Sequence, residues 1–130
     1  MPAGCRWRRC WRSWANPDPG WISPLANTAL LALTTEANLQ LAEQLASTLV
    51  ERQLAACVAL KPVTSIYRWQ GQIERGEEVQ ILIKSHPARA AALEKAVREL
   101  HSYGTPQWLT WPAEAGEAYA AWLSECCAIS

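Results

Sequence analysis

The chain has 130 residues, a length typical of one domain with its own core. Its 12 Lys and Arg residues balance 12 Asp and Glu residues, which argues against a general binder of nucleic acids or acidic substrates. The balanced charge therefore predicts no nucleic-acid partner. No stretch reaches the ~18 apolar residues of a membrane span, so we expect no membrane partner either. The 5 cysteines form no zinc-like spacing, and their odd number favours a reducing cytoplasm over a disulfide scaffold.

The first 26 residues differ in composition from the rest of the chain. They hold four closely spaced arginines interleaved with tryptophans, and half of the 8 tryptophans lie before residue 25. This mixture suits contact with a membrane surface or a nucleic acid, but Pro and Gly interrupt it, and it has neither a helix cap nor strand alternation. It also lacks the apolar core of a secretory signal. We therefore predict a disordered leader over residues 1–26 and one folded domain over residues 27–130.

The folded part is predicted to begin with a short strand, residues 28–35, that is apolar on both faces. Thr35 suits the N-cap of a following helix, with Glu36 in the first turn, where the helix dipole favours a carboxylate. Over residues 37–53 the apolar positions recur every three or four residues, which predicts an amphipathic helix. The apolar row on this helix consists of Leu41, Leu45 and Leu49.

A long strand over residues 56–69 is the next predicted element, and it too is apolar on both faces. Pro62 cannot donate to a ladder, so we expect it at a bulge or on an edge strand. Gln70 and Gly71, with the acidic stretch Glu74–Glu77, predict the hairpin end. The alternation over residues 79–84 predicts the return strand.

The last part of the chain is predicted to form a helix, a short strand and a second helix. Pro87 suits the first turn of the first of these helices, and Gly104 and Pro106 follow its end. Its buried stripe is predicted to be Ala90, Leu93, Val97 and Leu100. Residues 107–112 form the short strand, and residues 114–127 form an amphipathic helix. The expected anchors of this helix are Tyr119, Trp122 and Leu123.

The order β-α-β-β-α-β with an extra C-terminal helix predicts a ferredoxin-like α+β fold. Right-handed crossovers place both main helices on one face of an antiparallel sheet and leave the other face bare. More apolar strand residues are present than two helices can cover, which predicts self-association in a closed ring. The apolar strand residues that cannot all fit under the two helices are Leu31, Leu33, Cys57, Val63, Ile66 and Ile81.

Residues 28–122 resemble the CutA family, which is named for divalent-cation tolerance. The resemblance rests on the combination AACV, SIYRWQG and HSYGTP, which begin at Ala55, Ser65 and His101. It implies a tight, thermostable homotrimer, similar in architecture to the PII signalling trimers. The family usually has HPYEVPEI where this chain has HSYGTPQW, so two carboxylates are absent, at Gly104 and Gln107. Because carboxylates suit hard divalent ions, we expect weaker binding of such ions here.

The resemblance makes Cys57 and His101 the candidate metal ligands. A Cys57 thiolate would suit copper, but its apolar surroundings favour a small buried hydrophobe. His101 closes a helix, where capping or hydrogen bonding is the alternative role.

A second candidate site is an inter-subunit cleft that Tyr67, Trp69 and Tyr103 line, with Lys84 as its polar member. An aromatic-walled cleft with one cation would suit a small anionic ligand. The alternative is that these aromatic side chains only pack in an interface.

The sequence contains no Gly-rich phosphate loop, GxSxG or HExxH motif. A nucleophilic Cys57 paired with His101 would need a lowered thiol pKa, and an apolar setting does not lower it. We therefore predict a cytoplasmic, non-enzymatic homotrimer in divalent metal ion tolerance, with no required cofactor and with copper or another divalent cation as its partner. A PII-like sensor of a small anionic metabolite is the alternative. A structural scaffold whose trimer is its main property is the third hypothesis.

Overall fold

A computed structural model describes residues 27–129, so the predicted leader over residues 1–26 lies outside the described residues. Along the chain the elements are β1 (Thr28–Glu36), α2 (Leu39–Glu51), β2 (Cys57–Trp69), β3 (Gln72–Ser85), the 3-10 turn η1 (Pro87–Arg89), α3 (Ala90–Leu100), β4 (Leu109–Glu114) and α4 (Glu117–Cys126). This order confirms the predicted β-α-β-β-α-β arrangement with an extra C-terminal helix.

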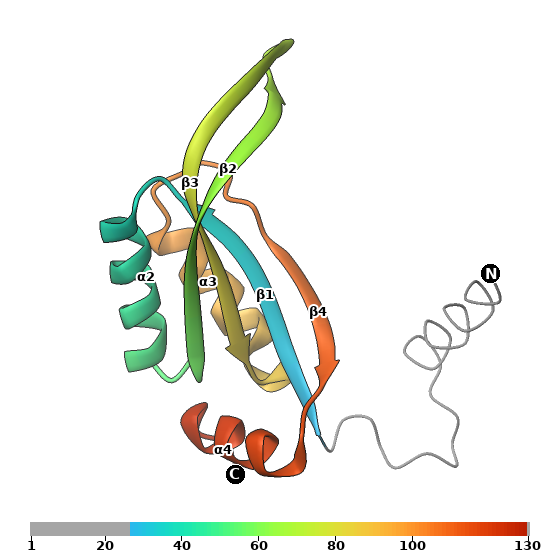
Figure 1. Ribbon diagram of the computed structural model, residues 1–130. Helices are drawn as coiled ribbons and strands as arrows, with labels where there is room; N and C mark the ends of the chain where they lie inside the picture. Colours follow the sequence, from blue (N-terminus) through green and yellow to red (C-terminus); the bar gives the residue numbers. More distant parts are fainter. Residues whose placement is uncertain (1–26, 130) are drawn as a thin grey trace, which may run out of the picture.

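The four strands form one antiparallel sheet in the order β2-β3-β1-β4. Helices α2 and α3 cover one face of this sheet, and the far end of the β2–β3 hairpin projects from the body (Figure 1). Helix α4 lies at the opposite end of the sheet from the hairpin tip (Figure 1). The fold is therefore the ferredoxin-like α+β arrangement, extended by a long hairpin and a last helix.

The main core lies between the sheet and the two helices that cover it. Alternate strand residues face the helices, so neighbours in the sequence differ sharply in burial. Ile81 and Ile83 are fully buried, whereas Leu82 between them is half-buried. From α2 and α3 the buried residues that meet these strands are Ala42, Leu45, Leu49, Leu93, Ala96 and Val97.

The first helix begins later than the sequence predicts. Asn38 is its N-cap, and its side-chain oxygen accepts a hydrogen bond from the Leu41 N–H at 2.9 Å. The prediction that Thr35 caps the helix is wrong, because β1 continues to Glu36 and buries both residues. The expectation of Glu36 in a first helical turn fails for the same reason.

The hairpin turn is tighter than predicted. Gln70 and Gly71 both have positive φ, 50° and 78°, and Trp69 pairs with Gln72 directly across the turn. A two-residue turn of this kind matches the twist of the two strands that it joins. The stretch Glu74–Glu77, predicted as part of the hairpin end, therefore belongs to β3. Pro62 lies on the edge strand β2, as its missing N–H requires.

The last helices are shorter than predicted and bury fewer of the expected residues. In α3, Leu93 and Val97 are buried as predicted, but Leu100 is 38% exposed. In α4, Leu123 is buried, whereas Tyr119 and Trp122 are 41% and 42% exposed in the single chain. The β4 strand begins at Leu109, two residues after the predicted start. Among residues 27–129, no helix is long and apolar enough to cross a membrane.

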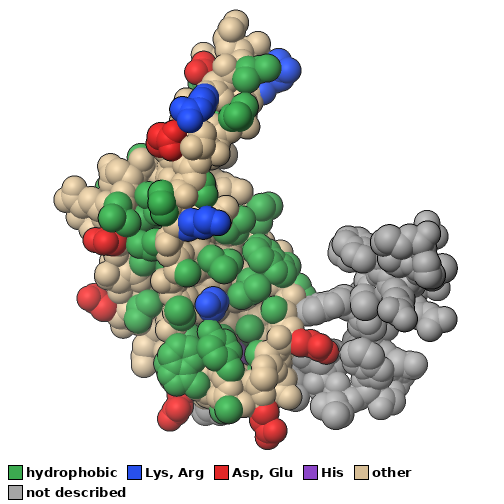
Figure 2. Space-filling model, viewed as in Figure 1, with side chains coloured by type: hydrophobic (Ala, Val, Ile, Leu, Met, Phe, Trp, Pro, Cys, Tyr) green, Lys and Arg blue, Asp and Glu red, His purple; other side chains and the backbone are tan. Residues whose placement is uncertain are grey.

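The sheet face that points away from the helices is open and largely apolar. Hydrophobic side chains spread over this face in Figure 2. Leu31 pairs with Trp111 and Leu33 with Leu109 across β1 and β4, and each of these side chains is half-buried or exposed. We call this set, with Leu82 of β3, the open sheet face. It confirms that the two helices leave apolar strand residues uncovered.

We expect Leu49→Ala to lower the free energy of unfolding by about 2–5 kcal/mol, because Leu49 is fully buried and its truncation leaves a cavity. Thermal unfolding at one fixed protein concentration measures this, since assembly makes the midpoint concentration-dependent. Leu39→Ala is the matched control. Leu39 lies on the same helix but is 54% exposed, so the same change should alter the midpoint far less. Equal losses in both variants would contradict the assigned core.

Candidate functional site

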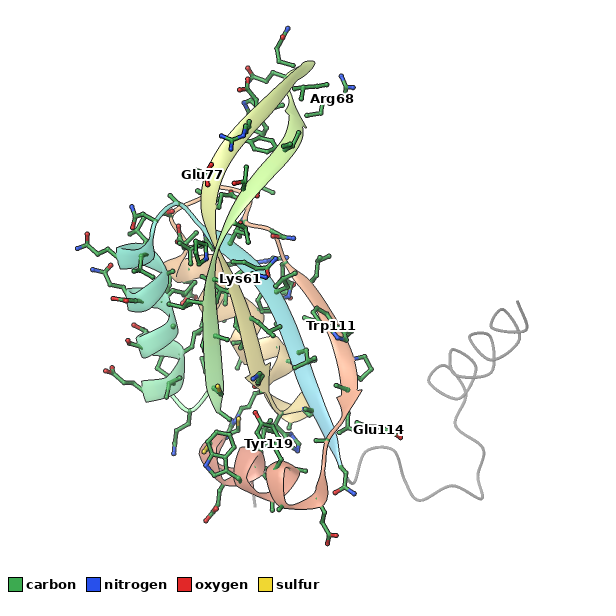
Figure 3. The ribbon with its side chains drawn as sticks, in the orientation of Figure 1. Lys61, Arg68, Glu77, Trp111, Glu114 and Tyr119 are labelled. Carbon is green, nitrogen blue, oxygen red and sulfur yellow. The ribbon has the colours of Figure 1, made fainter. Side chains whose placement is uncertain are left out.

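An open cleft of about 880 Å³ lies at the base of the β2–β3 hairpin. One wall is the hairpin, and the other is the loop that follows α3. Figure 3 shows how the hairpin, which carries Arg68 and Glu77, rises beside this loop. The residues that line the cleft are Thr35, Ser65, Tyr67, Trp69, Glu78, Tyr103, Gly104, Thr105 and Gln107. The structure therefore brings together three of the four side chains predicted for the ligand cleft, namely Tyr67, Trp69 and Tyr103.

Glu78 joins the two walls of the cleft. Its Oε2 accepts a hydrogen bond from the Ser65 hydroxyl at 2.8 Å, and its Oε1 accepts one from the Tyr103 hydroxyl at 3.1 Å. Burial, together with the hydrogen bond and negative charge of Glu78, raises the pKa of Tyr103 to about 12. The phenol therefore keeps its proton and acts as a donor to the carboxylate at neutral pH.

A buried carboxylate, Glu36, holds the loop side of the cleft. Its side chain accepts hydrogen bonds from the Ser102 hydroxyl, from the Ser102 N–H at 3.0 Å and from the Ala37 N–H at 3.0 Å. Burial alone would raise the pKa of Glu36, but these hydrogen bonds lower it below its ordinary value. Glu36 therefore stays ionised and fixes the residue that precedes Tyr103.

His101 lies beside Glu36 and is fully engaged within the fold. The Tyr103 N–H donates to His101 Nδ1 at 3.0 Å, so this nitrogen carries no proton. The Nε2–H then donates to the Thr35 carbonyl oxygen. Both ring nitrogens are occupied, and His101 is 9% exposed. In this arrangement His101 shapes the loop and has no free nitrogen for a metal ion.

Cys57 and Lys84 lie away from the cleft. They pair with each other across β2 and β3, near the end of the sheet that is remote from the hairpin tip. Along a strand that rises ~3.3 Å per residue, Cys57 is about 26 Å from Ser65, and Lys84 is about 20 Å from Glu78. Lys84 is thus outside the cleft of this chain, and Cys57 does not converge with His101. Within residues 27–129, no three His, Cys, Asp or Glu side chains are grouped to hold a metal ion.

Sequence reasoning missed the acidic and hydroxyl residues that organise the cleft: Glu36, Ser65, Glu78 and Ser102. A local signal exists for Glu78, because it alternates with the buried residues of β3 and so lies on the same face as the aromatic side chains of β2. No local signal predicts Glu36, since its partner Ser102 is 66 residues away in the chain.

The fold and the cleft define a ferredoxin-like protein with an open cleft at the base of a long hairpin. Residues 30–126 match the family model described as CutA1 divalent ion tolerance protein. The chain therefore belongs to the CutA1 family.

Relatives and solved structures agree with this family. The divalent-cation tolerance protein CutA of Pectobacterium atrosepticum is 40% identical over 98 residues, which cover 74% of this chain and 89% of that protein. The protein of the same name from Yersinia pestis is 37% identical over 112 residues, which cover 85% of this chain and 92% of that protein.

Among solved structures, CutA from Synechococcus elongatus has a TM-score of 0.75 and 37% identity, and the match covers 78% of this chain and 91% of that one. The periplasmic divalent cation tolerance protein CutA from Archaeoglobus fulgidus has a TM-score of 0.74 and 32% identity, with 76% of this chain and 98% of that one covered.

We expect Glu78→Gln to lower the pKa of Tyr103 from about 12 toward its ordinary value of 10, because the substitution removes the adjacent negative charge. Ultraviolet absorbance of the phenolate, taken as the difference between each protein and its Tyr103→Phe partner, measures this. Glu77→Gln is the control, since Glu77 lies on the opposite face of the same strand and bonds Thr64. A Tyr103 titration that Glu78→Gln leaves unchanged would show that the two groups do not interact.

Proposed function

We propose that this protein is a non-enzymatic homotrimer that acts in divalent-cation tolerance and binds copper more tightly than magnesium or calcium. The family to which the chain belongs supports the link to divalent cations. The open sheet face is the structural observation that carries the assembly. Cytoplasmic location is part of the proposal and rests on cysteine usage; one neighbour from Archaeoglobus fulgidus is described as periplasmic.

A second and a third copy of the chain would cover the apolar surface that the single chain exposes. Trp111 and Leu109 on the open sheet face are 39% and 51% exposed, and Ile66 and Ile73 on the hairpin are each 71% exposed. Ile66 and Ile73 lie on the opposite face of the sheet from Trp111 and Leu109. Large apolar patches in contact with water are rare on monomeric proteins, which favours a partner for these side chains. The sheet also has two edges, β2 and β4, whose backbone groups are available for pairing.

A binding role fits the arrangement of the reactive side chains. A thiol nucleophile needs an activating base within hydrogen-bond reach. His101, the base considered for Cys57, is engaged with Thr35 and Tyr103 at the other end of the sheet. A Cys57–His101 catalytic pair is therefore not formed within the chain.

Cys57 is the residue that supports copper binding. Its free thiol is half-buried on the open sheet face. Soft thiolate ligands select copper over magnesium and calcium, which prefer several oxygen ligands. In a trimer this thiol would lie among groups of the neighbouring copies. His101 remains the second candidate ligand, although it must first release one of its hydrogen bonds.

Light scattering of the full chain at micromolar concentration should give the mass of a trimer. Leu33→Asp places a charge on the open sheet face and should yield dissociated or insoluble protein. Leu39→Asp is the matched control, because Leu39 is exposed at the start of α2, where a carboxylate is favourable. A wild-type chain that is a stable, soluble monomer would contradict the proposed assembly.

Copper titration by calorimetry should show binding that depends on Cys57. The background needs Ser at the other four cysteines, Cys5, Cys10, Cys126 and Cys127, because a thiol at any of these positions competes with Cys57 for copper. In this background Cys57→Ser should weaken copper binding at least about tenfold, as expected when a soft ligand is lost. His101→Ala is the second arm.

Equal copper binding in the background and in both further variants would show that the site is elsewhere. A background that binds no copper would overturn the copper proposal. Magnesium is the comparison ion, and it should bind more weakly throughout.

A sensor role is the second candidate function, and the dimensions of the cleft favour it. A cleft of about 880 Å³ is large enough for a small organic molecule. Lys84, which was expected to attract an anion, lies outside the cleft, whereas Glu78 lies inside it.

A further inference from the structure

We propose that the cleft at the base of the hairpin takes a small organic cation, an ammonium compound with an apolar body. This inference rests on the proposed binding function of the cleft and names the class of ligand for it. Three features of the described residues carry it: the sign of the charge in the cleft, the aromatic walls, and the small number of oxygen ligands for a metal ion.

The charge that the described lining side chains place in the cleft is negative. Glu78 is the charged side chain among the described residues that line the cleft, and none of these lining side chains is basic. Its two hydrogen-bond donors, Ser65 and Tyr103, are neutral hydroxyl groups. A carboxylate has about four acceptor positions, so two of them remain for a ligand. Its negative charge therefore stays open to a cation in the cleft.

The walls beside Glu78 suit a cation that carries an apolar surface. Tyr67 and Trp69 are 47% and 61% exposed in the single chain, and both border the cleft together with Tyr103. The face of an aromatic ring attracts an ammonium group, most strongly for Trp. Aromatic rings beside one carboxylate are the combination that recognises quaternary and alkylated ammonium compounds.

A bare metal ion fits the same cleft less well. Calcium takes six to eight oxygen ligands, and magnesium requires near-octahedral coordination. The described lining residues offer one carboxylate, that of Glu78, and neither Gly104 nor Gln107 carries one. An anion is disfavoured by Glu78 itself. A weakly hydrated organic cation loses little hydration on binding. It is attracted both by the Glu78 carboxylate and by the faces of the aromatic rings.

Choline is the probe, and its neutral carbon isostere, in which carbon replaces the quaternary nitrogen, is the matched control ligand. Binding to the full chain is followed by ligand-observed nuclear magnetic resonance, which detects weak complexes. We expect choline to bind at least about tenfold more tightly than its isostere, the difference expected when a cation contacts aromatic faces beside a carboxylate. This comparison needs no substitution and so does not depend on the folding of a variant.

Two neighbouring substitutions then place the site. Glu78→Gln should weaken choline binding about tenfold, because it removes the negative charge beside the cation, whereas Glu77→Gln should leave it unchanged. Glu77 carries the same charge one residue away but faces the other side of the hairpin, where it pairs with Arg75 at 3.3 Å. Gln107→Glu adds a second carboxylate to the cleft and should strengthen choline binding severalfold.

Equal binding of choline and its isostere would overturn the inference, since the cleft would then recognise only apolar surface. Equal losses in Glu78→Gln and Glu77→Gln would also overturn it, because general surface charge would explain them. So would the absence of choline binding at millimolar concentration. If choline fails while the trimer and the Cys57-dependent copper binding hold, only the ligand class is wrong. If choline binds to a chain that neither assembles nor takes up copper, the proposed function fails and the ligand class stands.

Discussion

The hydrogen bonds that Glu36 accepts determine where the cleft forms. Glu36 ends β1 in a buried position, and its carboxylate binds both the N–H and the hydroxyl of Ser102. Hydrogen bonds to a charged group contribute about 1.5–3 kcal/mol each, more than neutral ones. They fix the chain immediately before Tyr103, whose hydroxyl reaches Glu78 on the hairpin. A row of polar contacts therefore runs from the edge of the core to the cleft.

This row of contacts satisfies groups that would otherwise be costly to bury. Every buried side-chain nitrogen and oxygen among the described residues has a hydrogen-bond partner. His101 is central to this, because it accepts from the Tyr103 N–H, donates to the Thr35 carbonyl oxygen and lies beside the Glu36 carboxylate. A buried imidazole with both nitrogens engaged orients its neighbours, and a ligand role would cost at least one of these bonds. The same geometry that builds the cleft thus limits the chemistry of His101.

The sequence predicted the elements of this structure well because their patterns are local. The Leu45 and Leu49 row, the alternation over β3 and the Gln70–Gly71 turn each lie within one segment, where hydrophobic period and turn chemistry act. The boundaries failed where tertiary contacts decide them. Glu36 resembles a residue of a first helical turn, but Ser102 draws it into the end of a strand. The sequence also could not predict that Tyr119 and Trp122 are exposed. Residue type alone does not tell whether an aromatic side chain packs within its own chain or against another one.

The candidate site shows the same division between residue type and position. Residue types suggested that Cys57, Lys84 and His101 belong to sites, but strand register decides which groups meet. Lys84 and Glu78 lie on one face of β3, because they are an even number of residues apart, yet about 20 Å separates them along the strand. Net charge cannot reveal the sign of the charge in the cleft, because the chain is neutral overall. The sign of the cleft is therefore a local property, set by the one carboxylate that the hairpin register places between Ser65 and Tyr103. With Gly104 and Gln107 beside it, that carboxylate has no acidic neighbour among the described lining residues, and the aromatic rings become the main additional source of attraction for a cation.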